Sequence, residues 1–408
     1  MGRPLTCRMA GGTVVAIAAG LMATAAPGVA ADRASEPTPA DLAARLDQRL
    51  PRPALPPITG GQRIPSVQEA LDALVAEGAV GTVGAIQRGA RHREWASGKK
   101  RIWHDAPVGA YAPFRVASNT KTMVATLVMQ LVERGEWRLS DRVNDLAPGL
   151  LAHHGNITLE QLLSHTSGMP DGVTQALIAH MDEPTWDGFF AALGDPYTDR
   201  EIITAALAQP WLAAPGTQFN YSNAGYVVLG QLLQRHTGRS LAALMRERIF
   251  VPSGMTKAEF ATRPGMPSAA LHDAAFTKWR WYSLKNFNPA LFSAAGATVA
   301  SSRDMVKFAN ALNNGRLVRK ATLANMRTPR TPDGYGLGMY RIPDPCRPGR
   351  LVYGHDGLSF GTASYALSSA DGTRQVVIGL TGRAYVNGVR PIPWDVNTPL
   401  LALFAETC

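Results

Sequence analysis

Residues 114–135 are FRVASNTKTMVATLVMQLVERG, and this stretch decides the fold. Its pattern predicts a strand over 114–117 and a helix over 122–134, with Ser118 and Lys121 at the junction. A hydroxyl and an amine one turn apart lie on one face of a helix, and the helix dipole favours negative charge at the serine. If the helix is buried, desolvation lowers the lysine pKa, so the amine can take the serine proton. The alternative is that Ser118 only caps the helix.

The Ser-x-x-Lys spacing is weak evidence by itself, because Ser97-Gly98-Lys99-Lys100 repeats it. That copy lies in a polar turn with no apolar helix behind it. Ser118 instead follows a predicted strand and opens an amphipathic helix. Its context therefore favours Ser118 as the nucleophile.

A second motif, Tyr221-Ser222-Asn223, lies in a segment that is predicted to be extended. There the side chains of Tyr221 and Asn223 point the same way. A phenol can relay a proton to a leaving group, and an amide can bind a substrate carbonyl. The alternative is that Asn223 only caps the helix that follows.

A third motif, His355-Asp356-Gly357, ends a predicted strand. The histidine can hydrogen-bond a reacting centre, and the glycine lets a substrate backbone lie close. A lone histidine on a strand is more often structural. Residues 357–361, GLSFG, match the nucleophile elbow of α/β-hydrolases, but that mechanism needs a later histidine and none follows His355.

The composition is that of a compact, well-buried protein. The chain has 408 residues, of which 46% are hydrophobic and 18% are charged, and this excludes disorder, collagen-like repeats and a long coiled coil. The formal net charge is +10, and it falls to +8 without the two arginines of residues 1–31. This modest excess suits contact with anionic cell-wall polymers, and the alternative is a solvated basic surface. Its longest basic block, Lys99–Arg101, is too short to favour nucleic acid. The histidines are scattered and lack the spacing of a metal site, so we expect neither nucleic acid nor a metal ion to bind.

The first 31 residues have the pattern of a cleavable export signal. Two arginines precede an apolar stretch over 11–26, and small residues end at Ala30-Ala31, where cleavage is expected. We expect export and release, and the alternative is an uncleaved anchor. Residues 32–63 are rich in proline and alanine and are predicted to form a tether.

The cysteines agree with export. Cys7 leaves with the signal, so the mature chain keeps one pair, Cys346 and Cys408. In an oxidising compartment the pair can form a disulfide, and closing a loop of this size contributes about 4 kcal/mol in the chain-entropy model. Two free thiols are the alternative.

Strand patterns at both ends of the chain flank a helical middle, which predicts one antiparallel sheet built from both termini, flanked by helices and carrying a mostly helical insertion. The α/β part is predicted over 64–138 and 277–408, and the insertion over 139–276. Asp371-Gly372 marks a hairpin turn. The predicted strands are 80–87, 93–96, 114–117, 335–341, 350–355, 362–367 and 375–380, and the predicted helices are 66–77, 122–134, 159–163, 225–234, 302–312 and 396–404.

The order of Ser-x-x-Lys, Tyr-Ser-Asn and His-x-Gly resembles the serine D-alanyl-D-alanine carboxypeptidase and class C β-lactamase family, which includes esterases and D-aminopeptidases. The pattern is most similar to secreted actinomycete-type carboxypeptidases, which share a late cysteine pair placed like Cys346 and Cys408. The resemblance implies an α+β, β-lactamase/transpeptidase-like catalytic domain over 64–408. The matching segments are 162–168, 215–216, 221–226, 295–296, 301–305, 335–338 and 352–355.

The resemblance also implies an acyl-enzyme mechanism without a cofactor. Ser118 would attack an amide or ester carbonyl, with Lys121 and Tyr221 sharing the proton transfers. Backbone N–H groups of Ser118 and Leu358 would form the oxyanion hole. The residues expected to orient substrate or base are Asn223, His355 and Gly357.

Two departures from the carboxypeptidase pattern affect the expected substrate. Asp356 stands where a threonine is usual, and Tyr340 stands where an arginine would bind the substrate carboxylate. Arg341 should face the other way on a strand. Asp356 would repel a substrate carboxylate at this place. We therefore expect the substrate to be a neutral ester or amide, or to carry a cationic amine that binds Asp356. The alternative is that Asp356 points to solvent.

Three functions remain after these arguments. The first is a secreted serine acyl hydrolase that uses a small-molecule or peptide acyl donor and water. The second is a transacylase of the same fold, in which an amine is the acceptor; an esterase or D-aminopeptidase is a variant of the first. The third is a non-catalytic binding or sensor relative, which should have lost part of the catalytic set. We expect a monomeric enzyme.

Overall fold

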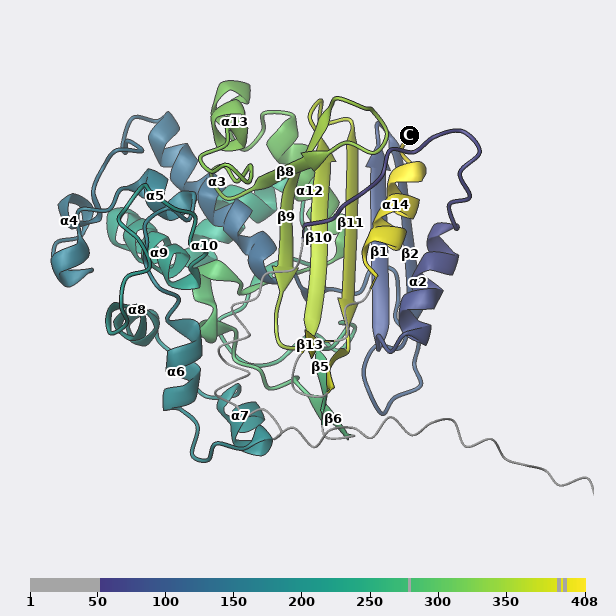
Figure 1. Ribbon diagram of the computed structural model, residues 1–408, viewed down its shortest axis with the longest axis horizontal. Coiled ribbons are helices and arrows are strands. Elements are labelled where there is room, and N and C mark those ends of the chain that lie inside the picture. Colours follow the sequence, from purple (N-terminus) through teal and green to yellow (C-terminus); the bar gives the residue numbers. More distant parts are fainter. Residues whose placement is uncertain (1–51, 278–279, 387–389, 392–394) are drawn as a thin grey trace, which may run out of the picture. The chain divides into compact units, whose positions relative to one another are not determined.

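A computed structural model describes residues 52–277, 280–386, 390–391 and 395–408. The predicted signal and most of the predicted tether lie outside these residues. The main sheet is six-stranded and antiparallel (Figure 1), and its strands β1 and β11 join the two ends of the chain. In spatial order the strands are β2 (Arg91–Gly98), β1 (Gly81–Arg88), β11 (Arg374–Thr381), β10 (Thr362–Ser369), β9 (Leu351–Leu358) and β8 (Tyr340–Pro343). The prediction of one antiparallel sheet built from both termini is confirmed.

The central strands are buried on both sides, so the sheet has two apolar faces. One face, with Ile86 and Val376, packs on α2 (Val67–Ala76) and α14 (Asn397–Ala405). The other face, with Ala85 and Val377, belongs to the larger core. Neighbours along a strand point to opposite faces, so each strand serves both layers.

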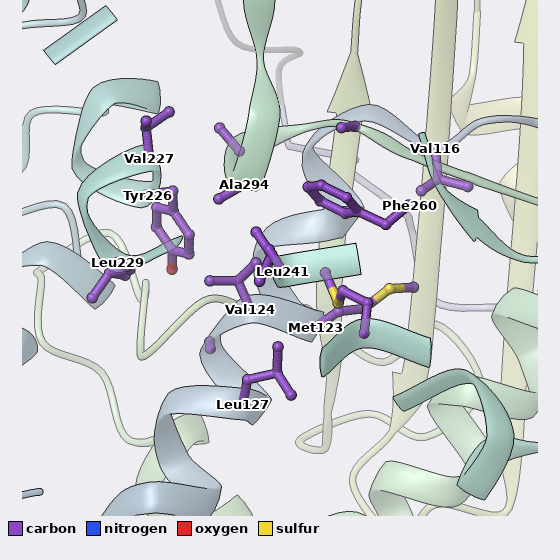
Figure 2. Close-up of a cluster of buried hydrophobic side chains, with 14 of the residues drawn as sticks. Val116, Met123, Val124, Leu127, Tyr226, Val227, Leu229, Leu241, Phe260 and Ala294 are labelled. Carbon is purple, nitrogen blue, oxygen red and sulfur yellow. The ribbon is translucent and has the colours of Figure 1, made fainter. Parts of the chain in front are cut away.

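The larger core lies around α3 (Thr120–Glu133). Figure 2 shows Val124 and Leu127 of this helix beside Leu229 of α9 (Asn223–Thr237), and all three are buried. Burial on every side of α3 explains why Lys121 has no exposure. The other helices are α4 (Val143–Leu146), α5 (Leu159–Leu163), α6 (Val173–Ala179), α7 (Trp186–Ala192), α8 (Asp199–Leu207), α10 (Leu241–Met245), α11 (Val251–Ser253), α12 (Ser302–Asn313) and α13 (Lys320–Arg327).

Most of the short elements lacked a recognisable sequence pattern and were not predicted; β3 (Phe114–Arg115) is the exception, because it lies within the strand predicted over 114–117. Two small sheets have the strand orders β3-β7-β4 and β13-β12-β5-β6. Their strands are β3 (Phe114–Arg115), β4 (Glu259–Phe260), β5 (Ala274–Thr277), β6 (Arg280–Ser283), β7 (Thr298–Ala300), β12 (Arg383–Val386) and β13 (Arg390–Pro391). A π-helical segment, η3 (Arg246–Phe250), follows α10. The 3₁₀ turns are η1 (Ala117–Asn119), η2 (Ala152–His154), η4 (Pro289–Leu291) and η5 (Ser293–Ala295).

The strand predicted over 335–341 is wrong for its first five residues, because β8 begins only at Tyr340. Gly338 has a φ of 74°, and a Cβ there would overlap the Cβ of Ala125 on α3. The segment before β8 is therefore a turn pressed against α3, which needs glycine. The predicted hairpin at Asp371-Gly372 is confirmed, since β10 and β11 pair antiparallel on either side of it.

The described end of the predicted tether lies against the domain. The N–H of Ile58 donates to the carbonyl of Pro345 at 2.7 Å, and the N–H of Ala54 donates to Asn397 Oδ1 at 3.2 Å. Arg52 pairs with Asp333. In Figure 1 this purple segment runs across the sheet ahead of α2.

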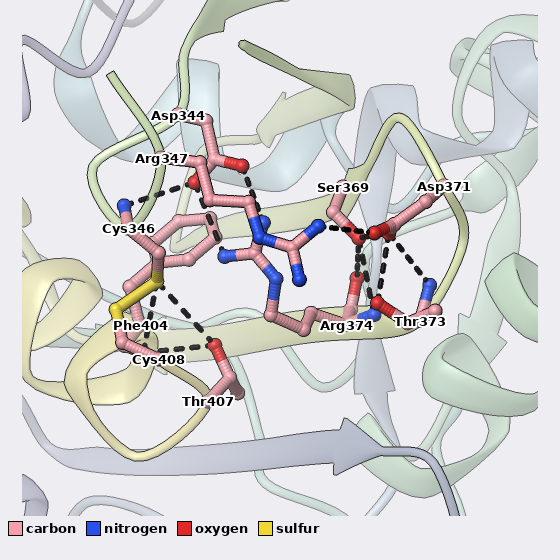
Figure 3. A network of polar contacts seen from close by, with 10 residues as sticks. All are labelled: Asp344, Cys346, Arg347, Ser369, Asp371, Thr373, Arg374, Phe404, Thr407 and Cys408. Atoms are coloured by element: carbon pink, nitrogen blue, oxygen red, sulfur yellow. Dashed lines mark hydrogen bonds and ion pairs between the residues drawn. A yellow bond between two sulfur atoms is a disulfide. The ribbon is translucent and has the colours of Figure 1, made fainter.

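A disulfide joins Cys346 to Cys408, with an S–S distance of 2.00 Å, and so holds the end of α14 to the loop after β8. Figure 3 shows it beside the buried pair of Arg374 and Asp344. Among the described residues, no helix has the length and apolar character that a membrane span requires.

Candidate active site

The candidate nucleophile lies in a tight turn that leads into α3. Ser118 is partly exposed in η1, and Ala117 before it has a φ of 48°, an unusual value for a residue other than glycine. Asn119 Nδ2 donates to Ser364 Oγ on β10 at 2.9 Å, and Ser364 Oγ donates to the carbonyl of Val116 at 3.0 Å. These bonds hold the strained turn against the sheet.

Lys121 is fully buried one turn after Ser118, and its Nζ meets three oxygen atoms. They are Ser118 Oγ at 3.0 Å, Asn223 Oδ1 at 2.7 Å and the carbonyl of Ala295 at 2.9 Å. The amide and carbonyl oxygens can only accept, so each uses one N–H of the amine. A neutral amine has two N–H groups and one lone pair, and a lone pair directed at Ser118 Oγ can take the hydroxyl proton.

The Tyr-Ser-Asn motif lies at the start of α9. Ser222 is the N-cap, because its Oγ accepts the N–H of Gly225 at 3.1 Å. The capping alternative for Asn223 is therefore wrong. Asn223 faces Lys121, and the ring of Tyr221 lies 4.7 Å from Lys121 Nζ.

The last half of β9 approaches the nucleophile turn. A Cβ at Gly357 would overlap the carbonyl oxygen of Val116 and lie 2.6 Å from Ser364 Oγ, so this approach requires glycine. The strand β8 pairs with β9 only as far as Gly354.

The N–H of Leu358 is directed away from β10. Ser359 donates its N–H to the carbonyl of Thr362 at 3.0 Å. Because bonded and non-bonded pairs alternate along an antiparallel ladder, the next pair, Leu358 and Ala363, is non-bonded. This N–H therefore points toward the edge of β9 that β8 leaves uncovered.

His355 is buried beside the site. Its Nε2 lies 2.9 Å from the hydroxyl of Tyr335, and its Nδ1 contacts the carbonyl oxygen of Asp356. The centroid of its ring is 6.4 Å from that of Tyr221. The structure thus brings the three predicted motifs together, although long stretches of chain separate them.

Asp356 and Tyr340 are placed inside the protein. Asp356 is 4% exposed and pairs in register with Tyr365, so the alternative that it points to solvent is wrong. Burial raises the pKa of Tyr365 well above its ordinary value, and the Asp356 charge raises it further. Tyr340 is 1% exposed, with Arg52 over its ring. The geometry therefore does not support the predicted contact of these two side chains with substrate.

Several residues at the site were not singled out from the sequence. Asp171 Oδ2 accepts from Asn223 Nδ2 at 2.6 Å, so it fixes the amide that faces Lys121. The hydroxyl of Tyr226 donates to the carbonyl of Leu163 at 2.8 Å; burial, with Tyr221 nearby, raises the pKa of Tyr226 well above its ordinary value. His165 and Tyr335 belong to matching segments of the family, which was the one available signal.

No group of three or more histidine, cysteine, aspartate or glutamate side chains among the described residues is arranged to hold a metal ion. The site consists of a hydroxyl, a buried amine, a phenol and an imidazole. Together with the fold, it defines a serine hydrolase.

The chain belongs to the Beta-lactamase family, whose model matches residues 67–396. It is 30% identical over 325 residues to penicillin-binding protein 4 of Amycolatopsis lactamdurans, covering 73% of this chain and 80% of that protein. A solved D-stereospecific amidohydrolase from Streptomyces sp. superposes with a TM-score of 0.73 and 30% identity, over 84% of this chain and 98% of that one. A D-amino acid amidase from Ochrobactrum anthropi shares the fold at 23% identity, with a TM-score of 0.69, over 83% of this chain and 97% of that one.

Proposed function

We propose that this chain is a secreted serine acyl hydrolase that forms an acyl-enzyme on Ser118 from an amide, peptide or ester. The observation that carries the proposal is the fully buried Lys121 Nζ, which lies 3.0 Å from the Ser118 hydroxyl and also contacts the acceptor oxygens of Asn223 and Ala295. Desolvation favours the neutral amine, which is the form that can act as a base.

In the acylation step, Ser118 Oγ attacks the carbonyl carbon as its proton passes to Lys121 Nζ. The new O–C bond produces a tetrahedral oxyanion, which the N–H groups of Ser118 and Leu358 would stabilise. The proton then passes, through the hydroxyl of Tyr221, to the leaving nitrogen or oxygen, and the bond to the leaving group breaks. Water repeats the sequence in reverse to release the acid and the free serine.

Asn223 and His355 would act as orienting groups. Asn223 is held between Asp171 and Lys121, so its amide is set before substrate arrives. His355 is held by Tyr335, next to the uncovered half of β9. A substrate backbone placed along this edge would pair as an added strand, with the glycine at 357 leaving room.

For the substrate, we propose preference for a neutral amide or ester over a free carboxylate. Position 340 is a buried tyrosine, and Arg341 lies against Gly334, with its Cγ 3.2 Å from the place of a Cβ there. Arg52 is paired with Asp333. The amidohydrolase similarity supports an amide, with D-configuration next to the scissile bond. Kinetics on a D-alanyl peptide and on its C-terminal amide test this, and a clear preference for the free acid refutes it.

Hydrolysis is favoured over transfer to an amine. The proposed dock for an ammonium group was Asp356, which is buried beside Tyr365. Secretion is supported by the leader pattern over 1–31 and by the disulfide, which needs an oxidising compartment.

The decisive experiment is intact-mass analysis after incubation with a fluorophosphonate and, separately, with a β-lactam. A fluorophosphonate adduct on Ser118 that disappears in Ser118→Ala supports the proposal. Ser97→Ala is the matched control, because Ser97 begins the other Ser-x-x-Lys sequence and donates its hydroxyl to Asp72 of α2. An adduct that survives Ser118→Ala refutes it. If the fluorophosphonate labels Ser118 and the β-lactam does not, the result supports the proposed preference for a neutral substrate over a free carboxylate.

A further inference from the structure

His165 adopts an unusual backbone conformation directly after α5. Its φ is 58°, in the left-handed region, and its side chain is 1% exposed. Histidine, asparagine and aspartate enter this region more readily than most residues, but at a cost in strain. Such strain persists where surrounding contacts enforce it, so the contacts of His165 are informative.

Those contacts hold the backbone on both sides of Tyr221. The N–H of Ser222 donates to His165 Nδ1 at 3.1 Å, and the N–H of Asn220 donates to the carbonyl of His165 at 2.7 Å. His165 thus binds both residues that flank Tyr221, namely Asn220 and Ser222. The imidazole also lies on the phenol, with ring centroids 4.2 Å apart.

The hydrogen bond from Ser222 determines the tautomer of the imidazole. Because Nδ1 accepts, the ring carries its proton on Nε2. A protonated imidazolium would also carry an N–H on Nδ1, and this donor would face the N–H donor of Ser222. The titratable groups in contact with the ring are Tyr221, Tyr226 and Tyr335. Lys121 Nζ lies 4.7 Å from the ring centroid of Tyr221 and 5.5 Å from that of Tyr226.

We propose that His165 is a positioning residue that aims the hydroxyl of Tyr221 at the leaving group. It acts through Tyr221 and does not touch the reacting atoms. This rests on the proposed function, in which Tyr221 passes the proton to the leaving nitrogen. A left-handed backbone is what lets the same residue offer both its carbonyl and its ring nitrogen to the segment 220–222.

The test compares two variants that both accept a positive φ. His165→Asn keeps an acceptor, its Oδ1, whereas His165→Gly removes it. His153→Asn, at an exposed histidine, is the matched control. Each variant is assayed on an amide and on the p-nitrophenyl ester of the same acyl group. The nitrophenolate leaves without a proton, whereas the amine does not.

We expect His165→Gly to lower kcat on the amide by about tenfold more than kcat on the ester, with KM little changed. His165→Asn should restore most of the amide rate. In a double-mutant cycle, His165→Gly should add little to Tyr221→Phe, because both remove the same proton path. Equal losses on both substrates, no rescue by asparagine, or additive losses with Tyr221→Phe would overturn the proposal.

A measurement on the unmodified protein covers the case in which the glycine variant does not fold. The ¹⁵N resonances of the His165 ring should show Nδ1 unprotonated throughout the active pH range, and a proton on Nδ1 overturns the proposal. Failure of the proposed function is a separate result: the wild-type protein would then not be labelled at Ser118, whatever the tautomer of His165.

Discussion

Lys121 and Asn223 are joined by a hydrogen bond of 2.7 Å, although 102 residues separate them in the chain. The bond connects the first turn of α3 to the first residue of α9. Asp171 holds the other end of the Asn223 amide at 2.6 Å. The acceptor that occupies one N–H of the buried amine is therefore itself fixed by a third segment.

Asp171→Asn should reduce the rate at which Ser118 is acylated. Asp171 Oδ1 also accepts the N–H of Val173, at 3.2 Å, so an asparagine that kept this bond would turn its NH₂ toward the NH₂ of Asn223. The displaced amide would no longer hold Lys121, and we expect a loss of about tenfold, or about 1.4 kcal/mol. The measurement is the second-order rate of fluorophosphonate labelling. Asp182→Asn, at an exposed aspartate, is the control, and an unchanged rate in Asp171→Asn would contradict the prediction.

Gly357→Ala should separate β9 from the nucleophile turn. The new methyl group would overlap the carbonyl oxygen of Val116, which is backbone and cannot rotate away. A displacement of about 1 Å at a reacting group can cost about a hundredfold in rate, so we expect a loss of that order in kcat/KM together with a lower Tm. Gly109→Ala is the matched control, since nothing lies within 4 Å of the place of its Cβ. Wild-type kinetics in Gly357→Ala would show that the approach is not needed.

Asp371 should stabilise the protein at neutral pH and lose that effect in acid. Burial raises the pKa of this carboxyl, but hydrogen bonds from Ser369, from Thr373 and from Arg347 outweigh burial and hold the pKa well below its ordinary value. Figure 3 shows this arrangement in the hairpin between β10 and β11. Because the folded pKa is depressed, the stabilisation is present above the unfolded pKa of about 3.9 and is lost as the pH falls.

The corresponding variant is Asp371→Asn. Because the side chain is partly exposed, we expect it to lower the free energy of unfolding by only about 1 kcal/mol at neutral pH. The difference from the wild-type protein should shrink as the pH falls below about 4. Urea denaturation of both proteins across this range measures it. A difference that stays constant with pH would contradict the assigned pKa direction.

Replacing Cys346 and Cys408 by alanine should destabilise the protein. The two cysteines are 62 residues apart, and removal of such a crosslink typically costs about 2–4 kcal/mol. Each single variant and the double variant should lose about the same amount, since either change removes the whole bond. Denaturation with and without reductant measures the loss. If reductant leaves the wild-type protein unchanged, the disulfide does not contribute.

The main elements could be predicted because their signals are local. The short apolar runs of β10 and β11, on either side of a turn signal, and the helical spacing of apolar residues in α3 are patterns within each segment. The strand predicted over 335–341 failed because Gly338 is pressed against α3, a contact between distant segments. The two-residue strand β4 was missed because so short a stretch has no period.

In the candidate active site, too, some residues could be predicted from local sequence and others could not. Ser118 and Lys121 could be paired from spacing, because three residues along a helix bring two side chains to one face. The importance of Asp171 and His165 depends on where α9 begins relative to them, which their own neighbours in sequence do not reveal. The burial of Asp356 and Tyr340 likewise depends on the sheet face covered by α14 and the segment around Arg52.

Periodicity and one-turn spacing act over a few residues, so the antiparallel sheet from both termini and the hydroxyl–amine pair where α3 begins could be read from the amino-acid order. The family followed from the order of three motifs. The surroundings of the pair became visible in the folded chain: which acceptors contact the amine, which residue is proposed to aim the phenol, and which expected substrate contacts are buried. Hydrogen-bond geometry and burial depend on segments that meet only in the folded protein. The sequence near each segment does not show which distant segment will contact it.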